Sequence, residues 1–291
     1  MRSRTSDIAI TVGLIGADIG PSLSPALHEH EAHRLGIPYA YERIDVAELG
    51  VGEGRVGELV RAARRLGFRG LNVTHPCKRA VTADLTDLSG DAIKLGAVNT
   101  IVFTDGRAIG HNTDWPGFER SFERGLPDVA RRRAVLIGAG GAGAAVAHAA
   151  LSLGIEHLSV HDRRPQAARD LVAALQRSFG GDRATVCEDV ADGCRRADGL
   201  IHATPTGMVT HPGLPVDAAV LREDLWVAEI VYRPLETELL RSARRAGCRT
   251  LDGGGMAVIQ AALSFELFTG VSPDLDRMLA HFAALSAPEA S

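Results

Sequence analysis

The sequence predicts two α/β domains, with C-terminal helices that return to the first domain. At 291 residues the chain is long enough for about two domains. Strand and helix signals alternate over the first 114 residues and start again after residue 133. From Met256 onward the pattern is helical, without a strand signal. We therefore expect one domain from residues 1–114 and 256–291, and a second from residues 115–255.

The charge balance limits the classes of partner. Lysine and arginine number 32, aspartate and glutamate 36, and the net charge is -4 at pH 7. Without a global excess of positive charge, no nucleic-acid partner is expected, and a small molecule is favoured. Residues Met1–Asp7 lack the apolar core of a signal sequence, and no run approaches the roughly 18 consecutive apolar residues of a membrane span. We expect a soluble, cytoplasmic protein with no membrane partner.

The cysteine and histidine spacings do not predict a metal site. The four cysteines show neither the Cys-x-x-Cys spacing of zinc sites nor the density of a disulfide scaffold, so we expect reduced thiols. Three histidines on one predicted helix do not converge on a single face. These residues are Cys77, Cys187, Cys194 and Cys248, and His28, His30 and His33. An alternative for Cys77 is a catalytic nucleophile, although the sequence offers it no base.

The first domain opens with strand and helix signals. Ile8–Ile15 is predicted to form a strand, and Ser24-Pro25 is typical of the cap of a helix that ends at Leu35-Gly36. Tyr39–Asp45 is the second predicted strand. The next helix has an apolar face made of Val56, Leu59, Val60 and Ala63, and Gly67 ends it.

A lysine occupies an unfavourable place after the third predicted strand. The apolar run Leu71–Val73 is followed by Thr74, a good helix N-cap, and by Pro76, which suits a first helical turn. Lys78 would lie in that turn, where the helix dipole disfavours a positive charge. Residues that break a local rule often mark functional sites, and a positioned amine suits proton transfer. A surface lysine without a function is the alternative.

A hairpin leads to a candidate acid. Asp105-Gly106 is a strong turn signal between the strand-like runs Ala97–Phe103 and Ala108–Asn112. Asp114 follows the second run. Its carboxylate either caps the helix that begins there or takes part in chemistry, and the two roles can coexist.

The second domain repeats the alternation of strand and helix. Arg131–Arg133 is expected to be a solvated edge before the first strand. Apolar runs then predict parallel strands, and an alanine-rich stretch predicts a helix. The predicted strands are Ala134–Ile137, Leu158–His161, Gly199–Ala203 and Trp226–Val231, and the helix is Ala142–Leu153.

A glycine-rich turn joins the first of these strands to its helix. Residues 138–143 are Gly-Ala-Gly-Gly-Ala-Gly, which matches Gly-x-Gly-x-x-Gly. In that pattern the first glycine permits a tight turn, the second lets a pyrophosphate approach the backbone, and the third lets helix and strand pack closely. Between an apolar strand and a helix, the pattern predicts a Rossmann doubly wound domain that binds a dinucleotide at the helix N-terminus.

The end of the next strand bears on the cofactor. Asp162 stands there, 24 residues after the first glycine. A carboxylate at this position accepts hydrogen bonds from ribose hydroxyls and repels a 2′-phosphate, which favours NAD. Arg163 and Arg164 argue the other way, because arginine binds phosphate. We expect NAD, with NADP possible as a secondary cofactor. The first domain would then hold the substrate, with Lys78 and Asp114 as candidates for proton transfer.

Several segments carry a family resemblance. In the first domain they are Ser22-Leu23-Ser24-Pro25 with His28, Asn72–Pro76 with Lys78, Gly96–Thr100, and Gly110–Asp114. Further along they are the glycine loop, Ala203–Met208, Tyr232-Arg233-Pro234 and Met256–Gln260. Together these segments resemble the shikimate dehydrogenase family, in order and over nearly the whole chain.

The resemblance implies roles for individual residues. Lys78 and Asp114 would form the catalytic pair, with Lys78 passing a proton to or from the reacting hydroxyl and Asp114 orienting both. Ser22 and Ser24 would hold the substrate carboxylate. The residues implied to bind the ring hydroxyls are Thr74, Asn99, Asp114 and Gln260, with Tyr232 nearby. Those implied to bind the cofactor are Gly138, Gly140, Gly141, Ala142, Gly143, Asp162, Arg163, Thr204, Pro205, Gly207, Met208, Ile230 and Gly253.

The resemblance also implies an activity. Asp162 is similar to the NAD-dependent quinate/shikimate dehydrogenase branch, whereas NADP-specific members commonly carry Asn-Arg-Thr there. The expected reaction moves a hydride between NAD and a ring hydroxyl of quinate or shikimate, with 3-dehydroquinate or 3-dehydroshikimate as the keto form. The substrate would be a cyclic polyol carboxylate of the shikimate pathway, in aromatic amino acid biosynthesis or quinate catabolism, and the protein a monomer or homodimer.

Alternatives remain open at this point. They are an NADP-dependent biosynthetic shikimate dehydrogenase, an aminoshikimate or aminoquinate dehydrogenase and, from a different class, a non-catalytic NAD-binding sensor. The chain also departs from the family pattern. Pro21 and Glu29 stand where a histidine and an asparagine are common, and Ala167 stands where an arginine is often found. The first two departures bear on the choice of substrate, and the third removes an expected contact with the adenine ribose.

Overall fold

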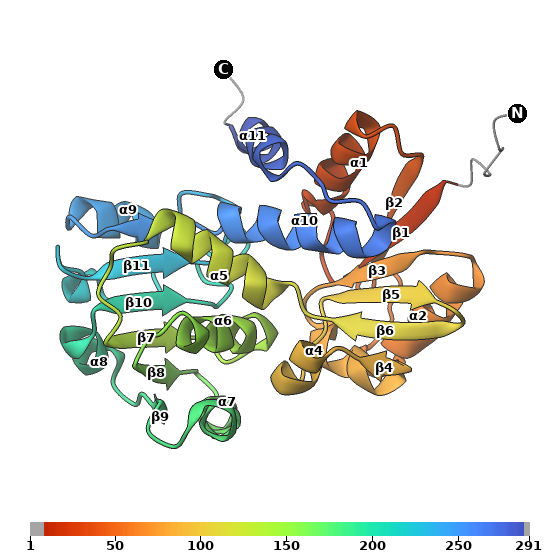
Figure 1. Ribbon diagram of the computed structural model, residues 1–291. Coiled ribbons are helices and arrows are strands. Elements are labelled where there is room, and N and C mark those ends of the chain that lie inside the picture. Colours follow the sequence, from red (N-terminus) through yellow and green to blue (C-terminus); the bar gives the residue numbers. More distant parts are fainter. Residues whose placement is uncertain (1–8, 288–291) are drawn as a thin grey trace, which may run out of the picture. The chain divides into compact units, whose positions relative to one another are not determined.

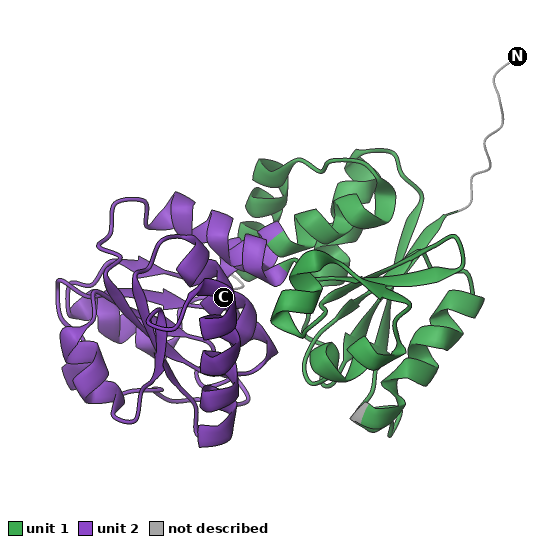
Figure 2. Ribbon diagram, turned by 60° about the horizontal axis from the view of Figure 1, so that its bottom comes forward, with its two compact units in different colours: residues 1–113, 260–291 green, residues 114–259 purple. Residues whose placement is uncertain are grey.

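The chain divides into two compact units, each built on one six-stranded sheet. The computed structural model describes residues 9–287, except for the side chain of Glu53. The first unit comprises residues 1–113 and 260–291, and the second comprises residues 114–259 (Figure 2). The two C-terminal helices extend through the second part of the first unit. The predicted fold class is therefore confirmed.

The first unit has short helices between the strands of its sheet. Its elements are β1 (Ile10–Gly16), α1 (Ser24–Arg34), β2 (Tyr39–Asp45), α2 (Val56–Arg65), β3 (Gly70–Val73), α3 (Cys77–Ala80), β4 (Asp87–Leu88), α4 (Gly90–Leu95), β5 (Thr100–Thr104), β6 (Arg107–His111), the last part of α10 (Gly254–Thr269) and α11 (Leu275–Ser286). Two 3-10 turns, at Glu53–Arg55 and Val81–Asp84, flank α2 and α3.

The sheet of the first unit is mixed, with the strand order β2-β1-β3-β5-β6-β4 (Figure 1). β1 pairs in parallel with β2 and β3, whereas β5 is antiparallel to β3 and β6. The reversal follows from the turn at Asp105 and Gly106, whose φ angles of 48° and 73° match a two-residue hairpin. Thr104 pairs with Arg107 across this turn, so the predicted hairpin is confirmed.

Both faces of this sheet are covered, and α10 supplies part of the cover. Because side chains alternate along a strand, Ile15 of β1 packs on the side of α2, whereas Val12 and Leu14 pack on the other side with Phe268 of α10. The last helix, α11, packs against α1. There, the fully buried Glu31 accepts a hydrogen bond from Nη2 of Arg277 at 2.6 Å.

The second unit alternates strands and helices throughout. Its elements are α5 (Asp114–Gly125), β7 (Arg133–Ile137), α6 (Gly141–Ser152), β8 (His157–His161), α7 (Pro165–Phe179), β9 (Ala184–Val186), α8 (Val190–Arg196), β10 (Gly199–His202), a 3-10 turn (Ala218–Val220), β11 (Trp226–Glu229), α9 (Glu238–Arg245), β12 (Thr250–Leu251) and the start of α10.

All pairings in the second sheet are parallel, in the order β12-β11-β10-β7-β8-β9. Helices cover both faces. Ala134 and Leu136 of β7 belong to one core with α5, α6 and α7, whereas Val135 and Ile137 belong to the other with α8 and α9. A strand buried on both faces reads as a continuous apolar run, which explains why β7 is easily recognised in the sequence.

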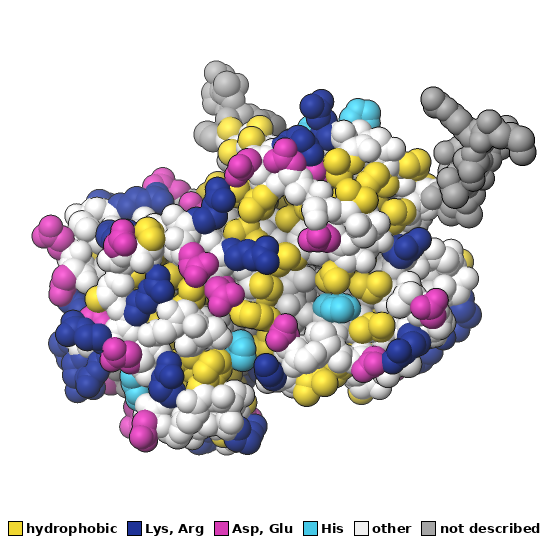
Figure 3. All heavy atoms as spheres, in the orientation of Figure 1, with side chains coloured by type: hydrophobic (Ala, Val, Ile, Leu, Met, Phe, Trp, Pro, Cys, Tyr) yellow, Lys and Arg dark blue, Asp and Glu magenta, His cyan; other side chains and the backbone are white. Residues whose placement is uncertain are grey.

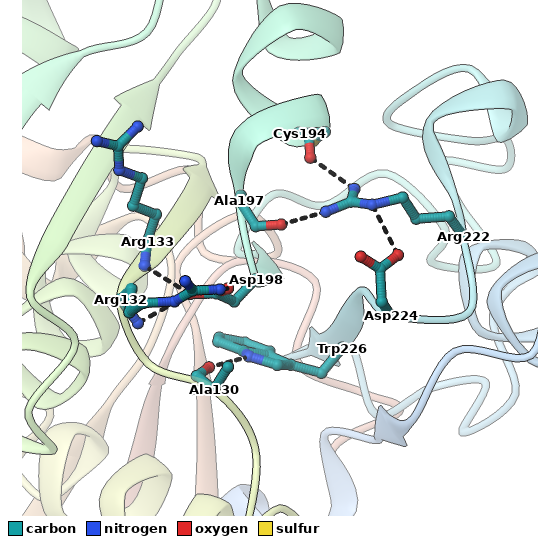
Figure 4. Close-up of polar contacts among 9 residues, drawn as sticks. All are labelled: Ala130, Arg132, Arg133, Cys194, Ala197, Asp198, Arg222, Asp224 and Trp226. Atoms are coloured by element: carbon teal, nitrogen blue, oxygen red, sulfur yellow. Dashed lines mark hydrogen bonds and ion pairs between the residues drawn. The ribbon is translucent and has the colours of Figure 1, made fainter.

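The amino ends of these strands are tied together by polar contacts (Figure 4). The backbone N–H groups of Arg132 and Arg133 donate to Oδ2 of Asp198 at 2.8 and 2.9 Å. The indole Nε1 of Trp226 donates to the carbonyl of Ala130 at 2.8 Å. The prediction of a merely solvated arginine run is therefore incomplete, because its backbone anchors the start of β7.

Some predicted details differ from the structure. The strands β4, β9 and β12 are only two or three residues long, too short to show a period in the sequence. The predicted cap role of Ser24 is wrong: Leu23 holds the N-cap position, and the Ser24 hydroxyl accepts instead from that of Ser22. The four cysteines are buried free thiols, as expected.

The surface has no single sign of charge on the face drawn in Figure 3, where acidic and basic side chains are interspersed. Throughout residues 9–287, every helix is too short or too polar to cross a membrane.

Gly199→Ala tests the packing of β10 against β11. A Cβ at this position would lie 2.0 Å from Cε2 of Trp226, whose ring is held by its bond to Ala130. We expect the substitution to lower the free energy of unfolding by about 2 kcal/mol, as overpacked cores do. Urea unfolding measures this. Gly181→Ala is the matched control, since no described atom lies within 4 Å of its Cβ position. Equal stability of the two variants would contradict the packing argument.

Candidate active site

The glycine loop of the second unit lies where the strand order reverses. β7 and β10 are neighbours in the sheet although far apart in sequence, and ligands of open parallel sheets bind at the carboxyl ends of such strands. Gly138 follows β7 with φ of +108°. A Cβ there would lie 2.5 Å from the carbonyl oxygen of Ala203 and 3.0 Å from Cγ2 of Thr204. Only glycine permits this approach.

The other two glycines of the pattern have different surroundings. A Cβ on Gly143 would lie 2.0 Å from the carbonyl oxygen of Gly138, so the third glycine lets α6 pack on the loop. Gly140 is different, because among the described residues no atom lies within 4 Å of its Cβ position. It precedes α6, a helix of 12 residues whose first N–H groups suit an anion. Open space beside these amides fits the pyrophosphate of a dinucleotide.

Asp162 is bonded to the glycine loop. Its Oδ2 accepts from the N–H of Ala139 at 2.8 Å, and its Oδ1 accepts from the N–H of Arg164 at 2.8 Å. Burial raises the pKa of Asp162, but these two N–H groups and the Arg164 guanidinium outweigh that effect and hold the pKa below its usual value. The carboxylate is therefore charged, and its side chain is 13% exposed. Arg163 and Arg164 are exposed beside it.

Two further segments meet at the same edge of the second sheet. In the loop after β10, Gly207 has φ of +97° and Met208 is 40% exposed. Beyond β11, a Cβ on Gly253 would lie 2.5 Å from the carbonyl oxygen of Ile230, so these two backbones touch. The structure thus brings Gly253 to Ile230 and Gly138 to Thr204.

Lys78 lies on a short helix of the first unit, and its local setting differs from the prediction. α3 begins at Cys77 and has four residues, with Pro76 at the N-cap position. The predicted cap role of Thr74 is wrong, because its carbonyl oxygen accepts from the N–H of Cys77 at 2.9 Å and closes a turn there. Lys78 is half-buried, and its carbonyl oxygen accepts from the N–H of Val98 at 2.8 Å. A helix this short offers little dipole, so that argument for Lys78 fails.

Two serines follow β1 in the chain, and Thr74 follows β3 beside the end of β1. The Ser22 hydroxyl donates to that of Ser24 at 3.3 Å, and both residues are half-buried. A Cβ on Gly16 would lie 2.3 Å from Cγ2 of Thr74, so glycine lets these strand ends approach. His28 of the resemblance lies in the core, where burial lowers its pKa to about 3, so it is neutral.

Asn99 is the centre of a buried network. Its Oδ1 accepts from the N–H of Thr113 at 2.7 Å, and its Nδ2 donates to the Thr113 hydroxyl at 2.9 Å and to Oε1 of Gln260 at 3.5 Å. Residues far apart in sequence, Asn99 and Gln260, are thus brought together. Asp114 and Tyr232 belong to the second unit; Asp114 is 5% exposed at the start of α5, and Tyr232 follows β11.

A buried pair, His202 and Glu229, is not among the residues predicted from the sequence. The two residues end β10 and β11, pair in register, and are joined at 2.9 Å between Nδ1 and Oε1. A histidine and an acid, each at the end of an apolar strand, were the available signal. Within residues 9–287 no three histidine, cysteine or acidic side chains are close enough to hold a metal ion.

Two family models match the chain. The model described as the shikimate dehydrogenase substrate binding domain matches residues 14–101. The model described as the shikimate 5′-dehydrogenase C-terminal domain matches residues 253–281. The first match falls in the unit that holds Lys78, and the second includes Gly253 and Gln260.

Similar proteins span nearly the whole chain. A shikimate dehydrogenase (NADP(+)) of Streptomyces avermitilis is 60% identical over 277 residues, which cover 94% of this chain and 95% of that protein. A quinate/shikimate dehydrogenase (NAD(+)) of Corynebacterium efficiens is 45% identical over 280 residues, covering 95% and 99%. The solved quinate dehydrogenase of Corynebacterium glutamicum in complex with NAD has a TM-score of 0.88 and 42% identity, covering 95% and 99%.

These likenesses and the dinucleotide cradle, which is the glycine loop of residues 138–143 with the start of α6, make the protein an NAD(P)-dependent oxidoreductase. An identity of 60% over 94% of the chain shows more, namely that it belongs to the shikimate dehydrogenase family. The family prediction is confirmed. Identity to the NADP(+) enzyme exceeds that to the two NAD-linked proteins, which runs against the expected branch.

Substitutions of two glycines separate cofactor binding from folding. Gly140→Ala adds a methyl group in open space, so we expect normal stability but at least about tenfold weaker dinucleotide binding, measured by NADPH and NADH fluorescence titration. Gly143→Ala forces its Cβ onto the Gly138 carbonyl and should lower the free energy of unfolding by about 1–3 kcal/mol. Unchanged dinucleotide affinity in Gly140→Ala would show that the pyrophosphate does not lie there.

Proposed function

We propose that the protein is a shikimate dehydrogenase, which interconverts shikimate and 3-dehydroshikimate with NADP(H). The observation that carries this proposal is the identity to the Streptomyces avermitilis enzyme along both chains. The glycine cradle at the switch point supports the cofactor class, because its open space at Gly140 and its close approach at Gly143 suit a bound pyrophosphate. A dinucleotide so bound supplies a ring that accepts or gives a hydride.

Lys78 is the proposed proton carrier. Oxidation of a ring hydroxyl releases a proton as the hydride leaves the same carbon, and a neutral Lys78 amine would accept it. In the direction of reduction, the Lys78 ammonium would return that proton to the oxygen. Its charge would also stabilise a developing alkoxide. Asp114 is the proposed orienting group, and its carboxylate is held in a buried position at the start of α5.

Ser22 and Ser24 are the proposed site for the substrate carboxylate. Their hydroxyls are neighbours at the start of α1, a helix of 11 residues whose first N–H groups favour an anion. Thr74, Asn99, Gln260 and Tyr232 are the proposed contacts of the ring hydroxyls. The bond from Asn99 to Gln260 supports a shared role for these two amides, since each orients the other.

Arg163 and Arg164 are the proposed contacts of the adenosine 2′-phosphate. Both side chains are exposed next to Asp162, and arginine pairs with phosphate through several donors. Asp162 repels a phosphate less than a free carboxylate would, because both of its oxygens accept hydrogen bonds from backbone N–H groups. We therefore propose NADP as the first cofactor in place of the expected NAD.

A second candidate is an NAD-dependent quinate/shikimate dehydrogenase. It is favoured by the acid at position 162 and by identities of 45% and 42% to NAD-linked relatives. An amino-substituted substrate would need the same proton carrier. A non-catalytic sensor would not need Lys78, so turnover separates it from the three enzymes.

Lys78→Ala tests the proton carrier. Loss of a group that acts in the transition state should lower kcat by about 100-fold or more while KM for shikimate changes much less. Steady-state assays with shikimate and quinate measure both constants. Lys94→Ala, on the exposed side of α4 in the same unit, is the matched control and should keep full activity. Near-normal turnover of Lys78→Ala would overturn the assignment.

The ratio of kcat/KM for NADP⁺ and NAD⁺ tests the cofactor. We expect the wild type to prefer NADP⁺, and we expect Arg163→Ala with Arg164→Ala to lower kcat/KM for NADP⁺ by about tenfold or more with little change for NAD⁺. Arg177→Ala, exposed at the end of α7, is the control for a lost positive charge. A wild-type preference for NAD⁺ would establish the second candidate instead.

A further inference from the structure

A chain of four polar side chains runs through the second unit behind the loop that follows β10. Nε2 of His202 lies 2.5 Å from Oγ1 of Thr204, and Nδ1 of His202 lies 2.9 Å from Oε1 of Glu229. The Thr237 hydroxyl donates to Oε2 of Glu229 at 3.1 Å. The His202 and Glu229 side chains are 0% exposed. The proposed proton transfer uses neither of them.

The hydrogen bonds of Glu229 define its proton state. Oε1 accepts from the N–H of Val231 at 2.9 Å as well as facing His202, and Oε2 accepts from Thr237. The Thr237 hydroxyl is free to donate because its oxygen accepts from the N–H of Leu240. Both Glu229 oxygens thus act as acceptors, so Nδ1 of His202 carries a proton and donates it to Glu229.

The hydrogen bonds of Thr204 depend on the protons that His202 carries. In a neutral His202, Nε2 is an acceptor, so the Thr204 O–H donates to it. The Thr204 oxygen also accepts from the N–H of Thr206 at 3.2 Å. A hydroxyl has one donor and two acceptor positions, so one acceptor position is left. Thr204 is half-buried, and its methyl group adjoins the Cβ position of Gly138 in the dinucleotide cradle.

We infer that His202 and Glu229 are positioning residues, which hold the Thr204 hydroxyl as a hydrogen-bond acceptor for the nicotinamide-riboside half of the cofactor. This inference rests on the proposed function. The ligand group must be a donor, and that half of the molecule has two kinds, the ribose hydroxyls and the carboxamide N–H. Because the Thr204 O–H donates to Nε2 of His202, its proton points toward the buried pair. A lone pair of the Thr204 oxygen is then available before the cofactor binds, so little ordering is needed on binding.

The number of protons on His202 decides whether the Thr204 hydroxyl accepts a hydrogen bond from the cofactor or donates one to it. If His202 carried a second proton, Nε2 would donate to Thr204, and the hydroxyl would become a donor to the ligand. The polar side chains bonded to His202 are those of Glu229 and Thr204, and the Thr237 hydroxyl is bonded to Glu229. With two protons on His202, the Thr204 hydroxyl would donate to an acceptor of the ligand, such as a carbonyl oxygen. The two protonation states of His202 therefore select different ligand groups.

The experiment compares the two halves of the cofactor. Thr204→Val removes the hydroxyl and keeps the shape, and it leaves the bond between His202 and Glu229 intact. We expect it to weaken binding of NADPH or NADH, whichever the wild type binds more tightly, by about tenfold. Binding of the matching fragment without nicotinamide, 2′,5′-ADP or ADP, should not change. Thr204→Ser, which keeps the hydroxyl, should restore the affinity.

His202→Asn tests whether the pair acts through Thr204. Its amide can still donate to Glu229 but has no counterpart of Nε2. We expect the same loss for the nicotinamide half as in Thr204→Val, and no further loss in the double variant. Full loss of binding to the fragments as well, or additive effects in the double variant, would overturn the inference.

The 3-acetylpyridine analogue of the cofactor identifies the donor, because it keeps the ribose and lacks the amide N–H. If Thr204→Val weakens its binding as well, the donor is a ribose hydroxyl. If the variant and wild type bind the analogue equally, the donor is the carboxamide. Equal NADPH and NADH affinities of Thr204→Val and the wild type would overturn the inference. A wild type that binds neither dinucleotide would overturn the proposed function with it.

Discussion

The close approach of three backbone segments at Gly138 governs the second unit. No Cβ fits between Gly138 and Ala203, or between Gly143 and Gly138, so β7, α6 and β10 meet with backbone against backbone. That contact aims the first N–H groups of α6 at the open space beside Gly140. It also sets Thr204 next to the loop. The open space beside the first N–H groups of α6 and the position of Thr204 thus follow from two missing side chains, those of Gly138 and Gly143.

The fold could be predicted where a residue's conformation depends on its close neighbours in sequence. Asp105-Gly106 makes its turn through local φ angles, and β7 is apolar because both of its faces are buried. Predictions were wrong or incomplete where a distant or competing partner decides. Thr74 uses its carbonyl in a turn rather than its side chain in a cap, and the arginine run is held by Asp198, which lies 66 residues away from Arg132.

The candidate site shows the same division. The glycine loop is visible in the sequence because Gly138 and Gly143 each answer a local steric demand. The hydrogen bonds of Asp162 are not visible in the sequence. Its oxygens accept from the N–H groups of Ala139 and Arg164, and these bonds depend on how β8 ends beside the loop. Glu229 and His202 became important only through the register of β10 and β11, which no spacing in the sequence reports.

The first unit is discontinuous, and this has a consequence for synthesis. Val12 and Leu14 are covered by Phe268, and Glu31 is bonded to Arg277, 246 residues later. The second unit is continuous, so a nascent chain has all of it before the cover of the first sheet leaves the ribosome. One face of β1 and β2 must therefore stay uncovered until α10 has left the ribosome. A chain that lacks α10 and α11 would therefore leave the hydrophobic core of its first unit incomplete.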